Sequence, residues 1–87
     1  MAKYYIVGFS DKLTYAQARE KAQARIIDAR NPPIKYIGRR GSFESSALAA
    51  QEFTLADAKK ECKEYNENPY IKGLKFVVID EQYKMIR

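Results

Sequence analysis

Two stretches of the sequence share one pattern and decide the predicted fold: LTYAQAR at Leu13–Arg19 and FTLADAK at Phe53–Lys59. In each stretch a threonine is followed three residues later by Gln or Asp, the spacing of a helix-capping box. In the same register Ala22 corresponds to Cys62, so the resemblance continues into the next helical turn. The pattern predicts two helices, which begin after Thr14 and Thr54.

Apolar residues at three- and four-residue steps give each predicted helix one buried stripe. The stripe of the first helix comprises Tyr15, Ala18, Ala22, Ile26 and Ala29, and that of the second comprises Leu55, Ala58, Cys62 and Tyr65. Asn-Pro follows each helix, at residues 31–32 and 68–69, and proline cannot continue a helix.

Strands are predicted around these helices from β-branched and aromatic runs. They span residues 3–9, 34–37 and 74–79, with residues 83–86 as a short fifth strand or a tail. A further strand is predicted at residues 46–53, because of their place before the second capped helix. Residues 46–53 also have an alternative interpretation, because Ala47–Ala50 has helical propensity. Each half of the chain then contains strand, capped helix, Asn-Pro and strand. The repeat predicts one α+β domain, residues 1–87, as a two-layer ferredoxin-like sandwich of order β-α-β-β-α-β.

The predicted core draws on both helices and the central strands. It comprises Ile6, Val7, Ala18, Ala22, Ile26, Leu55, Ala58, Cys62, Phe76 and Val78. Both faces of the first strand are apolar, since Tyr5, Val7 and Phe9 alternate with Tyr4 and Ile6. We therefore expect the face without helices to be covered by the tail, by a second subunit in a homodimer, or by RNA bases.

Charge points to an anionic partner. The 87 residues carry 16 Lys and Arg against 11 Asp and Glu, a net charge of +5, which favours nucleic acid, an acidic protein surface or anionic lipid. No stretch resembles a secretory signal or has the length of a membrane span. We expect a cytoplasmic protein that does not bind a membrane.

The sequence lacks the residues that several kinds of catalytic and binding site require. The chain has no histidine and one cysteine, so it cannot form a histidine-based catalytic triad or an intramolecular disulfide. Cys62 lies on a helix stripe and is interpreted as core. Gly38–Gly41 lacks the spacing of a phosphate-binding glycine loop. We expect no enzymatic activity, no catalytic residues, no metal site and no cofactor.

A basic hairpin is the candidate binding site. Residues 32–43 contain three cations and no acid, and the segment Gly38–Phe43 has the composition of a hairpin tip. Arginine suits phosphate and carboxylate contacts because its guanidinium is a rigid donor fork. The predicted binding residues are Lys35, Tyr36, Arg39, Arg40 and Phe43, with Arg25 from the first helix.

Two resemblances bear on function. Tyr5–Gly8 resembles the first-strand signature of the RNA-recognition motif, but Arg40–Gly41 is not followed by that family's stacking aromatics. Phe53–Lys59 and Leu74–Ile79 are similar to stretches of small proteins encoded by phages and mobile elements, which implies an inhibitor or modulator of host machinery. The leading expectation is a non-enzymatic binding module or regulator that acts on a host protein or ribonucleoprotein, such as a phage-type inhibitor of host defence. The alternative is direct RNA or DNA binding through the hairpin at residues 34–43 and the first helix.

Overall fold

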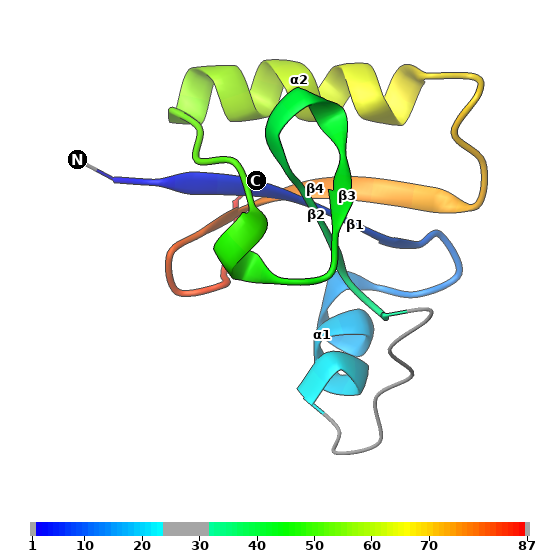
Figure 1. The fold of residues 1–87 in the computed structure, drawn as a ribbon. Helices are drawn as coiled ribbons and strands as arrows, with labels where there is room; N and C mark the ends of the chain where they lie inside the picture. The colour runs from blue at the N-terminus through cyan, green and yellow to red at the C-terminus, as the bar shows by residue number, and fades with distance from the viewer. Residues whose placement is uncertain (1, 24–31, 87) are drawn as a thin grey trace.

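The protein is a small α+β domain, described by a computed structural model over residues 2–23 and 32–86 (Figure 1). Its strands are β1 (Tyr4–Ser10), β2 (Lys35–Ile37), β3 (Phe43–Glu44), β4 (Leu74–Asp80) and β5 (Met85–Ile86). Its helices are α1 (Tyr15–Gln23) and α2 (Leu55–Glu67), with short 3₁₀ turns η1 (Arg39–Gly41) and η2 (Ala47–Ala49). The strands form one five-stranded antiparallel sheet in the order β3-β2-β1-β4-β5.

The longest pairing in the sheet joins β1 to β4. It runs from Tyr4 opposite Asp80 to Ser10 opposite Leu74, without interruption. β2 pairs with the other edge of β1, and the short β5 pairs with β4. Of the two alternatives predicted for residues 83–86, a strand or a tail, the structure has a strand that is limited to Met85–Ile86. Across the described ranges, neither helix combines the length and the apolar character that a membrane span requires.

The predicted helix starts are confirmed by their caps. The backbone N–H of Gln17 donates to Thr14 Oγ1 at 3.1 Å, and the N–H of Thr14 donates to Gln17 Oε1 at 2.9 Å. This is the reciprocal capping box. At α2 the N–H of Asp57 donates to Thr54 Oγ1 at 3.3 Å. The predicted end of the first helix at residue 31, and its stripe residues Ile26 and Ala29, lie outside the described residues.

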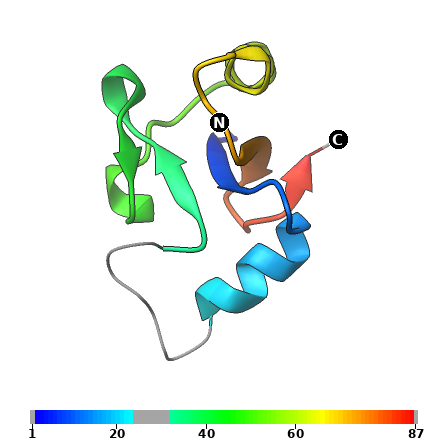
Figure 2. The same ribbon diagram turned by 90° about the vertical axis from the view of Figure 1, so that its right-hand side faces the viewer.

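The two helices contact different faces of the sheet, as Figures 1 and 2 both show. One buried cluster joins α2 to the sheet and contains Ile6, Ile37, Phe53, Ala58, Cys62, Phe76 and Val78. The other joins α1 to the opposite face and contains Val7, Phe9, Ala18, Ile34 and Ile79. Of the predicted core residues, Ala22 and Leu55 are only partly buried, Ile26 lies outside the described residues, and the rest are buried.

Helix α1 therefore covers the face that we expected the tail, a second subunit or RNA bases to cover. Ala18 is fully buried there, against Val7 and Phe9 of β1. The chain after β4 extends the sheet as β5 instead, and its Tyr83 contacts α1: the backbone oxygen of Tyr83 accepts the hydroxyl of Tyr15 at 2.7 Å. The expectation was wrong because it assigned both helices to one face.

The strand predicted at residues 46–53 is also wrong. Residues 47–49 form the 3₁₀ turn η2, and only isolated bridges follow, from Ala50 to Gly38 and from Phe53 to Tyr4. Ser46 explains the difference, because its Oγ accepts the backbone N–H of Leu48 at 3.2 Å and so closes the turn locally. The third strand is instead Phe43–Glu44, paired with β2. The ferredoxin-like order and the internal repeat are therefore not confirmed.

One contact joins the sheet, α2 and the hairpin formed by β2 and β3. Gly8 of β1 lies opposite Phe76 of β4, and a Cβ atom at Gly8 would come within 2.6 Å of the Phe76 ring. Because glycine leaves this space empty, the ring crosses β1 and stacks on Phe43 of β3, with centroids 6.2 Å apart. Tyr65 of α2 packs on the same ring at 5.2 Å.

The outer edge of β4 is completed by a side chain. The amide of Asn66 on α2 donates from Nδ2 to the backbone oxygen of Phe76 at 2.9 Å, and its Oδ1 accepts the Phe76 N–H at 2.8 Å. Further along the same edge of β4, the strand β5 pairs with it, and Val78 lies opposite Ile86. Asn66 thus occupies the position of a further strand residue and fixes α2 to the sheet.

The position of α1 predicts unequal effects of the same substitution at two helix positions. Ala18→Asp places a carboxylate in the fully buried site against β1, and we expect it to cost about 3 kcal/mol or more, or to unfold the domain. Ala16→Asp, at an exposed position of the same helix, is the control and should change stability by less than about 0.5 kcal/mol. Urea unfolding followed by circular dichroism measures both; equal losses would contradict the packing of α1.

Candidate functional site

The basic hairpin forms, but its second strand is Phe43–Glu44 and not the predicted residues 46–53. Strands β2 and β3 are joined by η1, and the backbone N–H of Gly38 donates to the Ser42 oxygen at 2.8 Å to close the turn. The tip lies beside α2, since a Cβ atom at Gly41 would come within 3.1 Å of the Tyr65 hydroxyl oxygen. Contacts with Phe76 and Tyr65 therefore hold the hairpin against the body of the domain.

The structure does not bring all the predicted binding residues together. Arg39 and Arg40 are both exposed at the tip. Phe43 is 47 % exposed, and the rest of its surface packs on the core. Lys35 and Tyr36 are neighbours on β2, so their side chains point to opposite faces of the sheet. Arg25 lies outside the described residues.

Tyr36 belongs to the α1 face rather than to the hairpin tip. It packs against the buried cluster under α1 and lines a small hollow with Tyr15, Arg19 and Tyr83. Burial raises the pKa of the Tyr36 hydroxyl above its ordinary value. The ring is interpreted here as part of the packing under α1.

Arg40 has a strained backbone. Its φ of 62° and ψ of 25° lie in the left-handed region, which side chains other than glycine and asparagine rarely adopt. Such a residue costs about 1–3 kcal/mol relative to a relaxed one, and strained positions of this kind cluster at functional sites. Arg40 and Arg39 are both exposed and line the same surface hollow.

Leu48 is the residue that sequence reasoning missed here. Its side chain is 100 % exposed, at the η2 turn. Leu48 and the two arginines line one surface hollow, which we call the tip surface: Arg39, Arg40 and Leu48. Two acids, Glu44 and Glu52, also line the hollow. Nothing in the sequence marked Leu48, since it lies in an alanine-rich segment that was predicted as a strand.

The acids of the hollow have contacts of their own. Glu44 Oε1 accepts the Ser42 hydroxyl at 2.9 Å, and Glu52 forms an ion pair with Lys3 at 3.3 Å. Both contacts hold the carboxylates toward the protein's own groups, although exposed pairs of this kind are individually weak. Neither of these two contacts involves Arg39 or Arg40.

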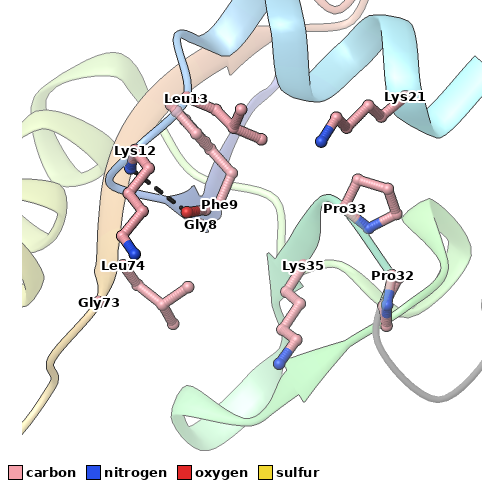
Figure 3. Close-up of a pocket in the computed structure, with 11 residues that line it drawn as sticks. Gly8, Phe9, Lys12, Leu13, Lys21, Pro32, Pro33, Lys35, Gly73 and Leu74 are labelled. Atoms are coloured by element: carbon pink, nitrogen blue, oxygen red, sulfur yellow. Dashed lines mark hydrogen bonds between the residues drawn. The ribbon is translucent and has the colours of Figure 1, made fainter.

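A second recess lies at the other end of β2, and its lysines come from three separate segments. Lys12 follows β1, Lys21 is on α1 and Lys35 is on β2, as Figure 3 shows. The recess has a volume of about 590 Å³, and no carboxylate of a described residue lines it. Of these three lysines, only Lys35 was predicted from the sequence as a binding residue.

Potential metal ligands and the single cysteine were located among the described residues. Within residues 2–23 and 32–86, no three His, Cys, Asp or Glu side chains gather as metal ligands would. Cys62 is buried under α2, and burial raises the pKa of its thiol. The thiolate that would act as a nucleophile is therefore disfavoured at neutral pH. The arrangement of exposed cations and an exposed apolar side chain is suited to binding.

Comparisons with known proteins add no assignment. No protein-family model, curated protein or solved structure matches the chain.

The strain at Arg40 predicts a stabilising substitution. Arg40→Gly should raise the free energy of unfolding by about 0.5–1 kcal/mol, because glycine adopts the left-handed conformation without steric cost and only part of this gain is offset by its unfolded-state entropy. Arg39→Gly is the matched control: Arg39 has no positive φ, so the same change should destabilise by about 0.5–1 kcal/mol. Urea unfolding measures both variants. A loss of stability in Arg40→Gly would show that the residue is not strained.

Proposed function

We propose that this protein is a non-enzymatic binding module that docks on a partner protein through the tip surface. The observation that carries the proposal is the complete exposure of Leu48 beside Arg39 and Arg40. Leucine gains free energy by entering an apolar pocket, and such pockets belong to proteins rather than to nucleic-acid backbones. Arginine is among the residues that anchor protein interfaces.

The tip surface is ordered before binding. The turn that presents Leu48 is closed by Ser46 Oγ and by backbone bonds from Ala49 to Ser46 and from Ala50 to Ala47, at 3.1 and 3.2 Å. The hairpin is held by Phe43 on the core. Because little order has to be gained on binding, less of the interaction free energy is lost to conformational entropy.

The charge of the tip surface specifies the partner's chemistry. Two exposed arginines favour acidic groups, and the net charge of +5 would speed the encounter with an acidic surface. We propose a partner surface with an apolar pocket for Leu48 flanked by Asp or Glu. A regulator of a cytoplasmic host protein or ribonucleoprotein, such as a phage-type inhibitor of host defence, is one concrete form of this function.

Affinity capture with matched variants tests the proposal. The tagged protein is incubated with an extract of its native cells after complete nuclease digestion. We expect one main partner protein to be retained by the wild type, and its amount to fall about tenfold or more with Leu48→Asp or with Arg39→Glu and Arg40→Glu together. Tyr70→Ser is the control, because Tyr70 is 92 % exposed but does not line the tip surface.

Two results would contradict the proposal. Loss of all captured protein on nuclease digestion would favour direct RNA or DNA binding, the alternative that the exposed arginines also allow. Equal capture by the wild type and the tip-surface variants would place the interface elsewhere. Circular dichroism of each variant shows whether the fold is retained.

A further inference from the structure

The turn between β4 and β5 contains a tyrosine in a conformation that tyrosine disfavours. Tyr83 has a φ of 64°, in the left-handed region, at the end of a hairpin loop where glycine is usual. The loop is closed by Asp80, whose Oδ1 accepts the N–H of Gln82 at 2.8 Å and that of Lys84 at 2.9 Å. Strained residues persist where the surrounding structure holds them, so the contacts of Tyr83 indicate its role.

Two hydrogen bonds and a ring contact join Tyr83 to α1. Its backbone oxygen accepts the hydroxyl of Tyr15 at 2.7 Å and Nη1 of Arg19 at 2.9 Å. The guanidinium carbon of Arg19 lies 5.4 Å from the centroid of the Tyr83 ring, within the range of a cation–π interaction. Figure 2 shows the C-terminal strand beside the start of α1. We call Tyr15, Arg19 and Tyr83 the latch, which shares no residue with the tip surface.

The latch forms only when α1 is helical. Tyr15 and Arg19 are four residues apart, the spacing that places two side chains on one face of a helix. The nine residues of α1 are too few to form a stable helix alone in water. Ala18 is the one buried residue of these nine, and Tyr15 and Ala22 are partly buried, so the latch is a large share of what holds α1. The helix and the strained turn therefore stabilise each other.

We propose that α1 is a releasable cover of the sheet and that the latch controls its release. Beneath α1 lies the apolar cluster that contains Val7, Phe9, Ile34 and Ile79. The long ladder of β1 and β4 and the packing of α2 on its other face involve no residue of α1. The domain therefore keeps its fold when α1 melts, which makes α1 a local unfolding unit. Release uncovers the apolar cluster and lets Tyr83 relax, so α1 and the turn change state together.

Hydrogen exchange followed by NMR tests the proposal with the double change Tyr15→Phe and Arg19→Gln. It removes both donors to Tyr83 but keeps a ring beside Phe9 and a good helix former at residue 19. We expect the α1 amides to exchange about tenfold faster or more, because the cover is released more often. The Asp80 N–H, which donates to the Lys84 oxygen across the turn at 3.0 Å, should exchange about threefold faster or more. The other amides of β1 and β4 should stay within about twofold of their wild-type rates.

Two further variants separate strain, contact and charge. Tyr83→Gly, added to the double variant, should return the Asp80 N–H toward its wild-type rate and leave α1 fast, because glycine is not strained at this φ. Lys21→Gln is the matched control for Arg19→Gln, since it removes a cation from an exposed position of the same helix. It should change the exchange of the α1 amides by less than about twofold.

Each of the following results would overturn the proposal. Wild-type exchange of α1 in the double variant would show that the latch does not hold the helix. Equal acceleration in α1 and in β1 and β4, or loss of the whole fold by circular dichroism, would show that α1 is not released on its own. An unchanged rate at Asp80 would show that the turn is not coupled to α1. Equal acceleration by Lys21→Gln would assign the effect to charge.

Discussion

The packing of the Phe76 ring across Gly8 is the contact on which the arrangement of this domain depends. β1 and β4 form the longest ladder of the sheet, and at Gly8 the absent side chain lets the ring of Phe76 pass over β1. The same ring packs against Phe43 of the hairpin and against Tyr65 of α2. Because the hairpin is held there, the tip surface has a fixed position relative to α2, and the arginines are presented from a rigid base.

The two faces of the sheet are covered by different helices. Helix α2 packs on the face that holds Phe76, and Asn66 joins it to the backbone of β4. Helix α1 closes the opposite face through Ala18 and, together with the chain before β2, leaves the lysine recess beside it. The tip surface and the recess share no described residue.

Features encoded by neighbouring residues could be predicted from the sequence, and features made by distant residues could not. The caps at Thr14 and Thr54, the strands β1 and β4 and the hairpin tip depend on local spacing, and they are confirmed. The strand predicted at residues 46–53 is wrong because it rested on their place before the second capped helix and not on the local cap at Ser46. The face covered by α1 was missed for a related reason, since an apolar stripe shows that a helix packs but not on which side of the sheet. Of the tip surface, the arginines could be predicted, whereas Leu48 joins them only through the folded chain.

A double-mutant cycle between Gly8 and Phe76 tests the central contact most directly. In the wild type, Gly8→Ala should lower the free energy of unfolding by about 1–3 kcal/mol, because the new Cβ lies 2.6 Å from a ring that Phe43 and Tyr65 confine. In a Phe76→Leu background the aromatic atoms are gone, and Gly8→Ala should be neutral or stabilising, as alanine is intrinsically favoured over glycine in a strand by about 0.5–1 kcal/mol. Urea unfolding of the four proteins gives the coupling energy, which we expect to exceed about 1 kcal/mol. Additive effects within about 0.5 kcal/mol would contradict the account.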